Sequence, residues 1–199
     1  KITRDRAFGK DRITVSGRGI GAELGDPYAL RVGRSSGVDR TAQQLMGDAL
    51  TINSVSLGWD IDWQLTDWLV LAGAWSHQGT AIEACARIAE AAGGYVQARR
   101  DSRVLEVLPR YPVAPWDWPG VTPDFSIPAA AITREGLEWR EKPAYNSVYL
   151  SGEGVGILGH VTRAGTAGDV LAPMLVDALI THSDAARQRG LRVLSDTGA

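Results

Sequence analysis

The sequence has few of the residues that build disulfides and metal sites. It contains one cysteine, Cys85, and three histidines in 199 residues. A single cysteine excludes an internal disulfide and any zinc site made of a cysteine cluster, which is typical of a reducing compartment or of indifference to redox conditions. The 21 Lys and Arg nearly balance the 23 Asp and Glu, for a formal net charge of −2. A chain with this balance creates no strong positive electrostatic field to attract nucleic acid or an anionic membrane, so we expect neither as a partner.

The sequence also lacks a long hydrophobic run. No apolar stretch approaches the roughly 18 residues of a membrane span, and the first residues, "KITRDRAFGKDR", do not have the pattern of a signal peptide. Hydrophobic residues still make up 44% of the chain and charged residues 22%, as is usual for a protein with a packed core. The chain begins without Met, just before a predicted strand, and we expect it to be a piece of a longer protein.

Residues 13–25, "ITVSGRGIGAELG", resemble a nucleotide-binding turn. Gly17, Gly19 and Ala22 fit the G-x-G-x-x-A pattern in which a strand presents a dinucleotide to a helix N-terminus. However, only one helical turn follows before Gly and Pro interrupt it, whereas a crossover with its helix needs at least about 10 residues. Residues 148–156, "VYLSGEGVG", repeat the Ser-Gly-x-Gly pattern after a second predicted strand. We therefore predict that these glycines form sharp turns and bind no cofactor.

Residues 33–37, "GRSSG", fit the G-x-S-x-G turn of serine hydrolases. In that interpretation Ser35 is the nucleophile, and His160 or His182 is the base. Such a turn places its serine directly at the start of a helix, but here Asp39, a good N-cap residue, delays the helix by several positions. About 32 residues precede the motif, too few for the parallel strands of a hydrolase sheet. We predict a solvent loop instead.

Apolar spacing predicts three helices. The first covers 39–50, and the second covers 80–94, where Thr80 and Glu83 form a capping box and two glycines end the helix. The third lies within 181–198 and ends at Gly198. Their apolar faces and caps are Ala42, Leu45, Met46, Ala49 and Leu50 in the first; Ile82, Cys85, Ala89 and Ala92 in the second; and Ala186, Val193 and Leu194, capped by Thr181 or Ser183, in the third.

Alternation and β-branched residues predict strands between these helices. In residues 59–65, "WDIDWQL", four apolar residues point to one side and three polar residues to the other. Another strand is expected at 68–73, a hairpin that turns at Asp101-Ser102 at 95–109, and two strands at 145–152 and 157–165.

Two further candidate sites have simpler explanations. Asp60 and Asp62 form a D-x-D pair, but no neighbouring His, Glu or Asp completes a set of metal ligands, so we predict solvated carboxylates. Cys85 faces the core of its helix and has no histidine beside it, so we predict an unreactive thiol rather than a nucleophile. The sequence thus predicts no catalytic residue, no metal and no cofactor.

Six of the nine prolines lie in 109–128, "PRYPVAPWDWPGVTPDFSIP". A segment with so few backbone donors is an extended connector. Trp116 and Trp118 could form a sugar-binding platform, but we favour rings that hold the connector onto a domain or onto a partner subunit.

The chain resembles the tail hub proteins of tailed bacteriophages and prophages, relatives of the T-even baseplate hub, the Mu tail protein and the gene D late-control proteins. The resemblance is carried by "VSGR", "GTAIEACARIAEAAGGYVQARRDSRVLEVLPRYP", "PWDWP", "YNSVYLSGEGVGILGHVTRAGTAGD" and "APMLVDALITHSDAARQRGLRVLSDTG". It implies an α+β fold, mostly antiparallel, with β-barrel segments flanking a small α/β module. The implied parts are the end of a first barrel (1–24), a small α/β domain (25–110), a Pro/Trp-rich connector (111–144) and a second barrel segment with a terminal helix (145–199).

The resemblance also implies a structural role and no enzymatic activity. The protein would form a ring, as a homotrimer, that joins the tail tube to the tip or spike. Its partners would be its own copies and the neighbouring tail proteins, and its location the virion tail, after assembly in the host cytoplasm. The alternative is a carbohydrate-binding or peptidoglycan-acting domain of a tail-associated protein, motivated by seven tryptophans. Against it, no local pair of carboxylates suits a glycosidase.

Overall fold

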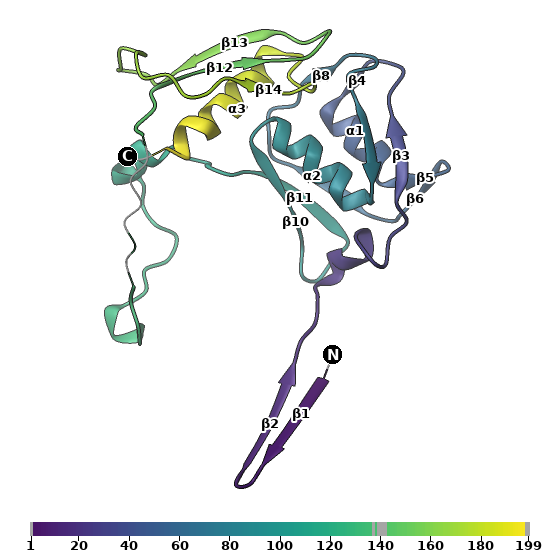
Figure 1. The fold of residues 1–199 in the computed structure, drawn as a ribbon, viewed down its shortest axis with the longest axis vertical. Helices are drawn as coiled ribbons and strands as arrows, with labels where there is room; N and C mark the ends of the chain where they lie inside the picture. Colours follow the sequence, from purple (N-terminus) through teal and green to yellow (C-terminus); the bar gives the residue numbers. More distant parts are fainter. Residues whose placement is uncertain (1, 137, 139–142, 198–199) are drawn as a thin grey trace.

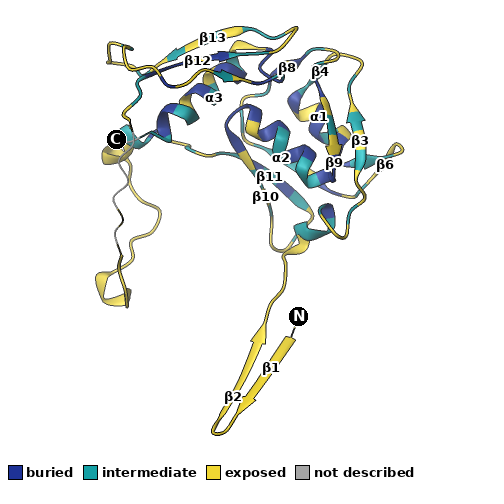
Figure 2. Cartoon of the chain, viewed as in Figure 1, coloured by how far each residue is buried: buried dark blue, intermediate teal, exposed yellow. Residues whose placement is uncertain are grey.

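The computed structural model describes residues 2–136, 138 and 143–197. It has an α/β body, a smaller part made of a sheet and a helix, and two segments that project away from them on the same side (Figure 1). One projection is an N-terminal hairpin and the other is part of the connector between the two parts. The buried residues lie in the body and in the smaller part, mostly on their helices and central strands, whereas both projections are exposed (Figure 2).

The N-terminal hairpin, which we call the arm, consists of residues 2–15. Its strands β1 (Ile2–Ala7) and β2 (Lys10–Val15) pair antiparallel, from Ile2 opposite Val15 to Ala7 opposite Lys10. Gly9 allows the tight turn because its φ is +75°. Every residue of both strands is exposed.

The α/β body is built around two helices, α1 (Ala42–Ala49) and α2 (Ala81–Ala91), which pack on each other. Its strands are β3 (Val32–Ser35), β4 (Arg40–Thr41), β5 (Thr51–Ile52), β6 (Val55–Ser56), β7 (Asp60–Trp63), β8 (Leu69–Val70), β9 (Ser76–Gly79), β10 (Gly94–Ala98) and β11 (Val104–Pro109). The main sheet has the order β10-β11-β7, and short antiparallel pairs β3-β9, β4-β8 and β5-β6 surround the helices.

Both helices begin at capping boxes. The predicted box of Thr80 and Glu83 is present at α2, and all the apolar residues expected to face inward from α1 are buried. The start of α1 differs from the prediction, because Thr41 is the N-cap and pairs with Gln44 in a second capping box. Asp39 instead accepts the backbone N–H of Ala72, at 2.9 Å. A side chain that can cap a helix was therefore used to fix a neighbouring loop.

The main sheet confirms the alternation read in residues 59–65. Ile61 and Trp63 pack against the core and Trp59 is 5% exposed, whereas Asp60 is exposed on the opposite face. β10 and β11 form the expected hairpin. β7 joins β11 in parallel, with Ile61 opposite Leu105, so a segment some 40 residues away along the chain completes the sheet.

The smaller part places α3 (Ser183–Ser195) against one face of a three-stranded sheet. The strands are β12 (Ser147–Ser151), β13 (Leu158–Thr162) and β14 (Leu175–Val176), in the order β13-β12-β14. The N-cap of α3 is His182, whose ring accepts the N–H of Asp184, and not Thr181 or Ser183 as predicted. Thr181 is buried and donates its hydroxyl to the carbonyl of Leu69. The predicted end of the helix, Gly198, lies outside the described residues.

The two Ser-Gly-x-Gly stretches differ in structure. Gly152 and Gly156 approach so closely that a Cβ on either would lie within 2.3 Å of the other's Cα, and Gly154 has a φ of +60°. That turn requires glycine, as predicted. The prediction is wrong for Gly17 and Gly19, which have open space around them and no positive φ, and which lead into the short 3₁₀ helix η1 (Ile20–Leu24).

The fold class is α+β with mostly antiparallel pairing, as expected. Among the described residues no sheet closes into a barrel, and both the arm and the β13-β12-β14 sheet are open. The connector contains two 3₁₀ turns, η2 (Pro115–Gly120) and η3 (Ala129–Ala131). Outside these turns the described part of the connector is extended and without strands, from Pro112 to the start of β12.

An ion pair joins the body to the smaller part. Both Nη atoms of Arg87, on α2, donate to the carboxylate of Asp177, at 2.9 and 2.7 Å. The same carboxylate accepts the N–H of Leu179, whose carbonyl in turn accepts the indole N–H of Trp68 at 3.0 Å. Leu179 belongs to the core of the body, so the chain that leaves β14 crosses back before α3 begins.

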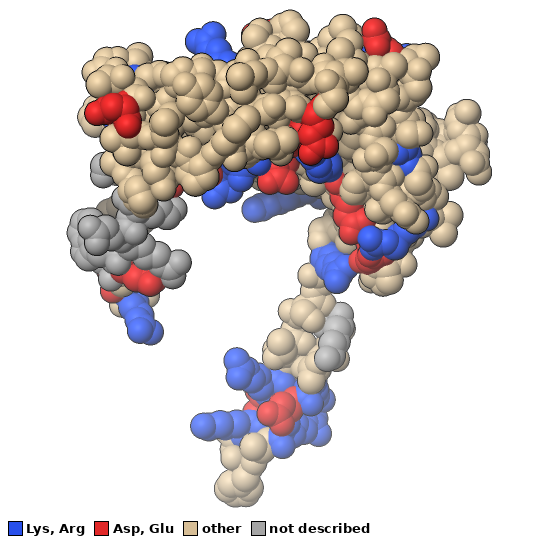
Figure 3. Space-filling model, turned by 45° about the horizontal axis from the view of Figure 1, so that its top comes forward, with Lys and Arg blue, Asp and Glu red and all other residues tan. Residues whose placement is uncertain are grey.

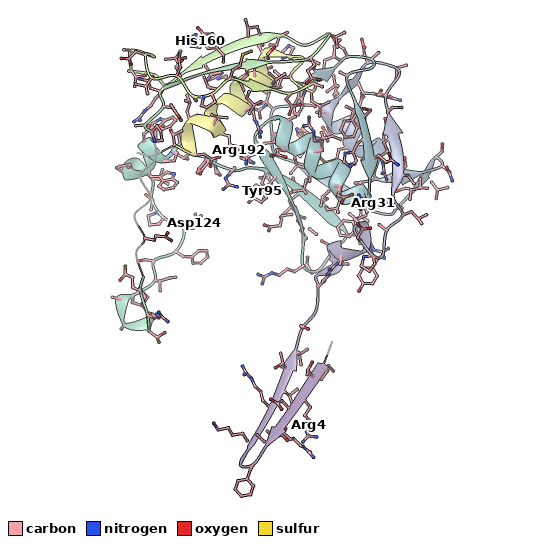
Figure 4. All side chains as sticks on the ribbon, viewed as in Figure 1. Arg4, Arg31, Tyr95, Asp124, His160 and Arg192 are labelled. Carbon is pink, nitrogen blue, oxygen red and sulfur yellow. The ribbon has the colours of Figure 1, made fainter. Side chains whose placement is uncertain are left out.

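We expect Asp177→Asn to lower the free energy of unfolding by about 2 kcal/mol, because Arg87 would keep its charge and lose an ionised partner that is 8% exposed. Urea denaturation followed by tryptophan fluorescence measures the loss. Asp124→Asn is the matched control, since that residue is exposed on the connector (Figure 4), and we expect a change within about 0.5 kcal/mol. Equal effects of the two substitutions would contradict this role of Asp177.

Candidate functional site

The glycine-rich stretch does not form a dinucleotide site. β2 pairs only with β1, and the helix that follows the glycines is a 3₁₀ segment of five residues without a side-chain cap. A pyrophosphate site of this type needs a long helix whose first N–H groups are free. The stretch lines an open hollow with Arg18 and Tyr28 at the base of the arm. Glu23 also lines this hollow, and a carboxylate there disfavours a bound phosphate.

A second hollow, of about 300 Å³, lies beside the first and contains an internal ion pair. Glu23 accepts the indole N–H of Trp59 at 2.6 Å and the guanidinium of Arg103 at 2.9 Å. Glu23 thus ties η1 to Trp59, the residue before β7, and to the turn before β11. Three of the polar side chains that line this hollow, Glu23, Trp59 and Arg103, are thus paired with one another, which suits a structural joint.

Ser35 lies at the end of β3, exposed, in an antiparallel pair with β9. A hydrolase nucleophile needs a base within hydrogen-bond reach. The two histidines considered as its base have other partners: His160 lies on β13 and bonds Ser147, and His182 caps α3 and bonds Asp184. The structure therefore does not bring the predicted serine and histidines together.

A serine–histidine pair that the sequence analysis missed lies on the smaller sheet. Ser147 Oγ and His160 Nε2 are 2.5 Å apart, and the histidine ring stacks on Tyr149 with 4.2 Å between centroids. The pairing of β12 with β13, which sets Tyr149 opposite His160, was the only signal that could have revealed it. Ser147 is 0% exposed, so no substrate can reach its hydroxyl, and the pair is a structural hydrogen bond.

Of the D-x-D pair predicted to be solvated, Asp60 is exposed, but Asp62 takes part in an ion network. Arg99 donates to Asp62 at 2.6 Å and to Glu106 at 2.8 Å, across three strands of the main sheet. The two acidic neighbours raise the pKa of Arg99, first through its hydrogen bond to Glu106. A carboxylate held by a guanidinium is a poor metal ligand. Within residues 2–136, 138 and 143–197, no group of three or more His, Cys, Asp or Glu side chains is arranged to hold a metal ion.

Cys85 is buried in the core of the body, as predicted. Burial raises the pKa of its thiol to about 12, because the thiolate would lose its hydration there. The thiolate is the reactive form of cysteine, so Cys85 is not available as a nucleophile.

We expect Cys85 to remain unmodified when the folded protein is treated with iodoacetamide at pH 8 and to react fully in denaturing urea. A Thr3→Cys variant provides the control, because residue 3 is exposed on the arm and its thiol should react at once in the folded protein. Mass spectrometry of the tryptic peptides distinguishes the two sites. Rapid labelling of Cys85 in the folded protein would show that the core opens, or that the thiol lies closer to solvent.

Of the two tryptophans of the connector, Trp116 holds it onto the smaller part and Trp118 does not. Trp116 packs on the core formed by β12, β13 and α3, and the Arg163 guanidinium lies 4.5 Å from the centroid of its ring. Trp118 donates its indole N–H to the carbonyl of Val113 and is 55% exposed. One face of Trp116 is therefore covered by an arginine, whereas a sugar platform needs a free aromatic face.

We expect Trp116→Ala to destabilise the protein by about 2 kcal/mol, through lost packing and the lost cation–π contact, and Trp118→Ala to cost less than about 1 kcal/mol. Urea denaturation of the single variants measures both. Comparable effects would mean that Trp118 carries as much of the attachment as Trp116.

What the fold leaves open is a pair of apolar surfaces at opposite ends of the molecule. At one end is the arm, and at the other is the face of the β13-β12-β14 sheet that points away from α3, which we call the outer face (Figure 1). The outer face consists of Tyr149, Leu158, Leu171, Met174 and Val176, which are 38–67% exposed. Both phenylalanines of the sequence also lie on the projections, Phe8 at 108% and Phe125 at 90% exposure. Side chains that proteins normally bury are thus presented to solvent.

No protein-family model matches the chain, and no curated protein matches it. Among solved structures, a tail protein from Neisseria meningitidis MC58 has a similar fold, with a TM-score of 0.51 and 14% sequence identity. The likeness covers 98% of this chain and 56% of that one, so the chain spans little more than half the length of that protein. No described helix is long and apolar enough to cross a membrane. At this identity the comparison shows that the two proteins share a fold.

Proposed function

We propose that this chain is a structural component of a bacteriophage or prophage tail, and that it contributes to a hub ring joining the tail tube to the tip or spike. The observation that carries the proposal is the fold shared with a tail protein over 98% of the chain. A match of this extent includes the body, the connector, the smaller part and the arm together, rather than one widespread motif.

The condition of the candidate sites supports a structural role. The two histidines considered for Ser35 bond other residues. Asp62 is held by an arginine, and Cys85 is buried with a raised pKa. Meanwhile the exposed apolar surfaces at the two ends suit contacts with other protein chains. Candidate sites without a reactive arrangement, together with exposed apolar surfaces, suit a protein that functions through assembly.

The carbohydrate-binding or peptidoglycan-acting alternative receives less support. It was motivated by the seven tryptophans, of which Trp116 and Trp118 were considered as a sugar platform. Arg163 covers one face of Trp116, and Trp118 bonds the carbonyl of Val113. If it were correct, the purified protein would clear a suspension of cell walls or sediment with it. The hub proposal expects neither.

For the hub, we propose a homotrimer located in the virion tail, with neighbouring tail tube, tip or spike proteins as its other partners. Head-to-tail contacts between identical chains close into a ring or grow into a filament, and a ring of fixed size suits a tail junction. The arm and the outer face supply two unlike apolar surfaces for such contacts.

We expect the intact protein to have the mass of a trimer in light scattering and to form rings with a central hole in electron micrographs. Mass spectrometry of purified tails or particles should detect the protein, and antibodies against it should label one end of the tail. A monomer at tens of micromolar, a range in which assemblies of modest affinity already form, would contradict the ring. Absence from the particles would contradict the tail role itself.

A further inference from the structure

We propose that the arm of one copy docks onto the outer face of a second copy, head to tail. The proposal rests on the proposed function only in that both require self-association. It names the two surfaces that meet: residues 2–15 on one chain, and the exposed side of the β13-β12-β14 sheet on the other.

The arm needs an apolar surface to cover it. Its register places Ile2 opposite Val15 and Ile13 opposite Arg4, so the three aliphatic side chains share one face of the hairpin. They are 75%, 72% and 62% exposed for Ile2, Val15 and Ile13, respectively. An isolated two-stranded hairpin is at best marginally stable in water, and a third layer or strand is needed to stabilise it. The same face carries Arg4, Arg6 and Asp11, which form ion pairs with one another. The arm therefore has an uncovered apolar patch close to where it joins the body, with charged side chains beside it.

The outer face is a surface of the required kind. The strand register and the exposure place Tyr149, Leu158 and Val176 on the side of the sheet away from α3. None of the residues of β12, β13 or β14 is Asp, Glu, Lys or Arg, and Figure 3 shows few charged side chains above these strands. The register places the exposed His160 and Thr162 on the same side, so the face is largely but not wholly apolar. A solvent-exposed face of this kind gains most by covering another apolar layer, and its strands offer no Lys or Arg to nucleic acid or lipid headgroups.

The charges of the two surfaces are complementary. Residues 2–15 carry four Lys and Arg and two Asp, whereas the remaining chain carries 17 Lys and Arg and 21 Asp and Glu. The arm is therefore basic, as its side chains in Figures 3 and 4 show, and the rest of the molecule is acidic. Two exposed carboxylates, Glu153 and Asp169, flank the outer face, from the turn after β12 and from the loop before β14. Asp169 is held ionised, because the hydrogen bond from Asn146 lowers the pKa of its carboxyl group.

The position of the two surfaces selects a second copy. The arm points away from the body along the long axis of the molecule, and the outer face lies at the other end (Figure 1). Within one chain they cannot meet without a large rearrangement. Between copies, the same pairing repeats from each chain to the next, which is a heterologous contact able to close a ring.

The test compares three substitutions of matched chemistry and exposure in the intact protein. Ile13→Asp alters the arm and Leu158→Asp the outer face, at residues 62% and 67% exposed. Val55→Asp is the control, at a residue 68% exposed in the β5-β6 hairpin, away from both surfaces. Light scattering across a dilution series measures the dissociation constant of self-association. We expect Ile13→Asp and Leu158→Asp each to raise it at least about tenfold, and Val55→Asp to leave it unchanged. Higher salt should weaken the unaltered assembly as well, because the contact pairs a basic arm with an acidic rim.

A crosslinking measurement keeps the proposal testable if a substitution disturbs folding. Val15→Cys and Leu158→Cys variants, mixed and oxidised, should form a covalent dimer that neither variant forms alone, and the buried Cys85 should not take part. If the assembly persists in both Ile13→Asp and Leu158→Asp, the docking of the arm on the outer face is wrong, and the proposed ring must form through other contacts. Crosslinks between two arms, or from the arm to a different tail protein, would also overturn the docking of the arm on the outer face. The proposed function is tested separately, by detection of the protein in tail particles.

Discussion

The contact between Arg87 and Asp177 determines how the two parts of this protein are held together. The helix that carries Arg87 is the centre of the body, and the carboxylate lies in the crossing segment that returns from the smaller sheet to the body's core. Asp177 also accepts the N–H of Leu179. One buried carboxylate therefore contacts α2, through Arg87, and the turn that places the carbonyl of Leu179 within hydrogen-bond distance of Trp68. The packing of Leu179 and Ala185 in the core of the body and the bond from Thr181 to Leu69 also contribute to the attachment of the smaller sheet.

Local structure followed from the sequence wherever one physical signal was sufficient. The capping box at Thr80 and the alternation around Trp63 identified a helix and a strand correctly, because each depends on residues within one or two turns. The cap of α3 was wrong because Thr181 is needed elsewhere, by the carbonyl of Leu69, more than 100 residues away. Competition between local and distant partners for one hydroxyl cannot be read from spacing.

The candidate sites show the same division. That Cys85 faces the core was predictable from helical periodicity, since position on a helix determines burial. The Ser147–His160 pair was not, because it depends on the register of two strands joined by a glycine turn, and a shift of one residue would have separated them. The arginine beside Asp62 comes from a neighbouring hairpin and was equally invisible. Sequence reasoning thus recognised isolated groups well and their partners poorly.

The prolines of the connector have a consequence for the open edges of the sheets. β13 leaves one edge of the smaller sheet unpaired, and such an edge can recruit any chain that offers a row of amide donors and carbonyls. With six prolines in residues 109–128, the segment that runs beside Arg163 at the end of β13 cannot supply that row. Residues 109–128 therefore cannot pair with β13 as an extra strand. For the same reason, this segment does not promote aggregation through strand pairing between molecules at high protein concentration.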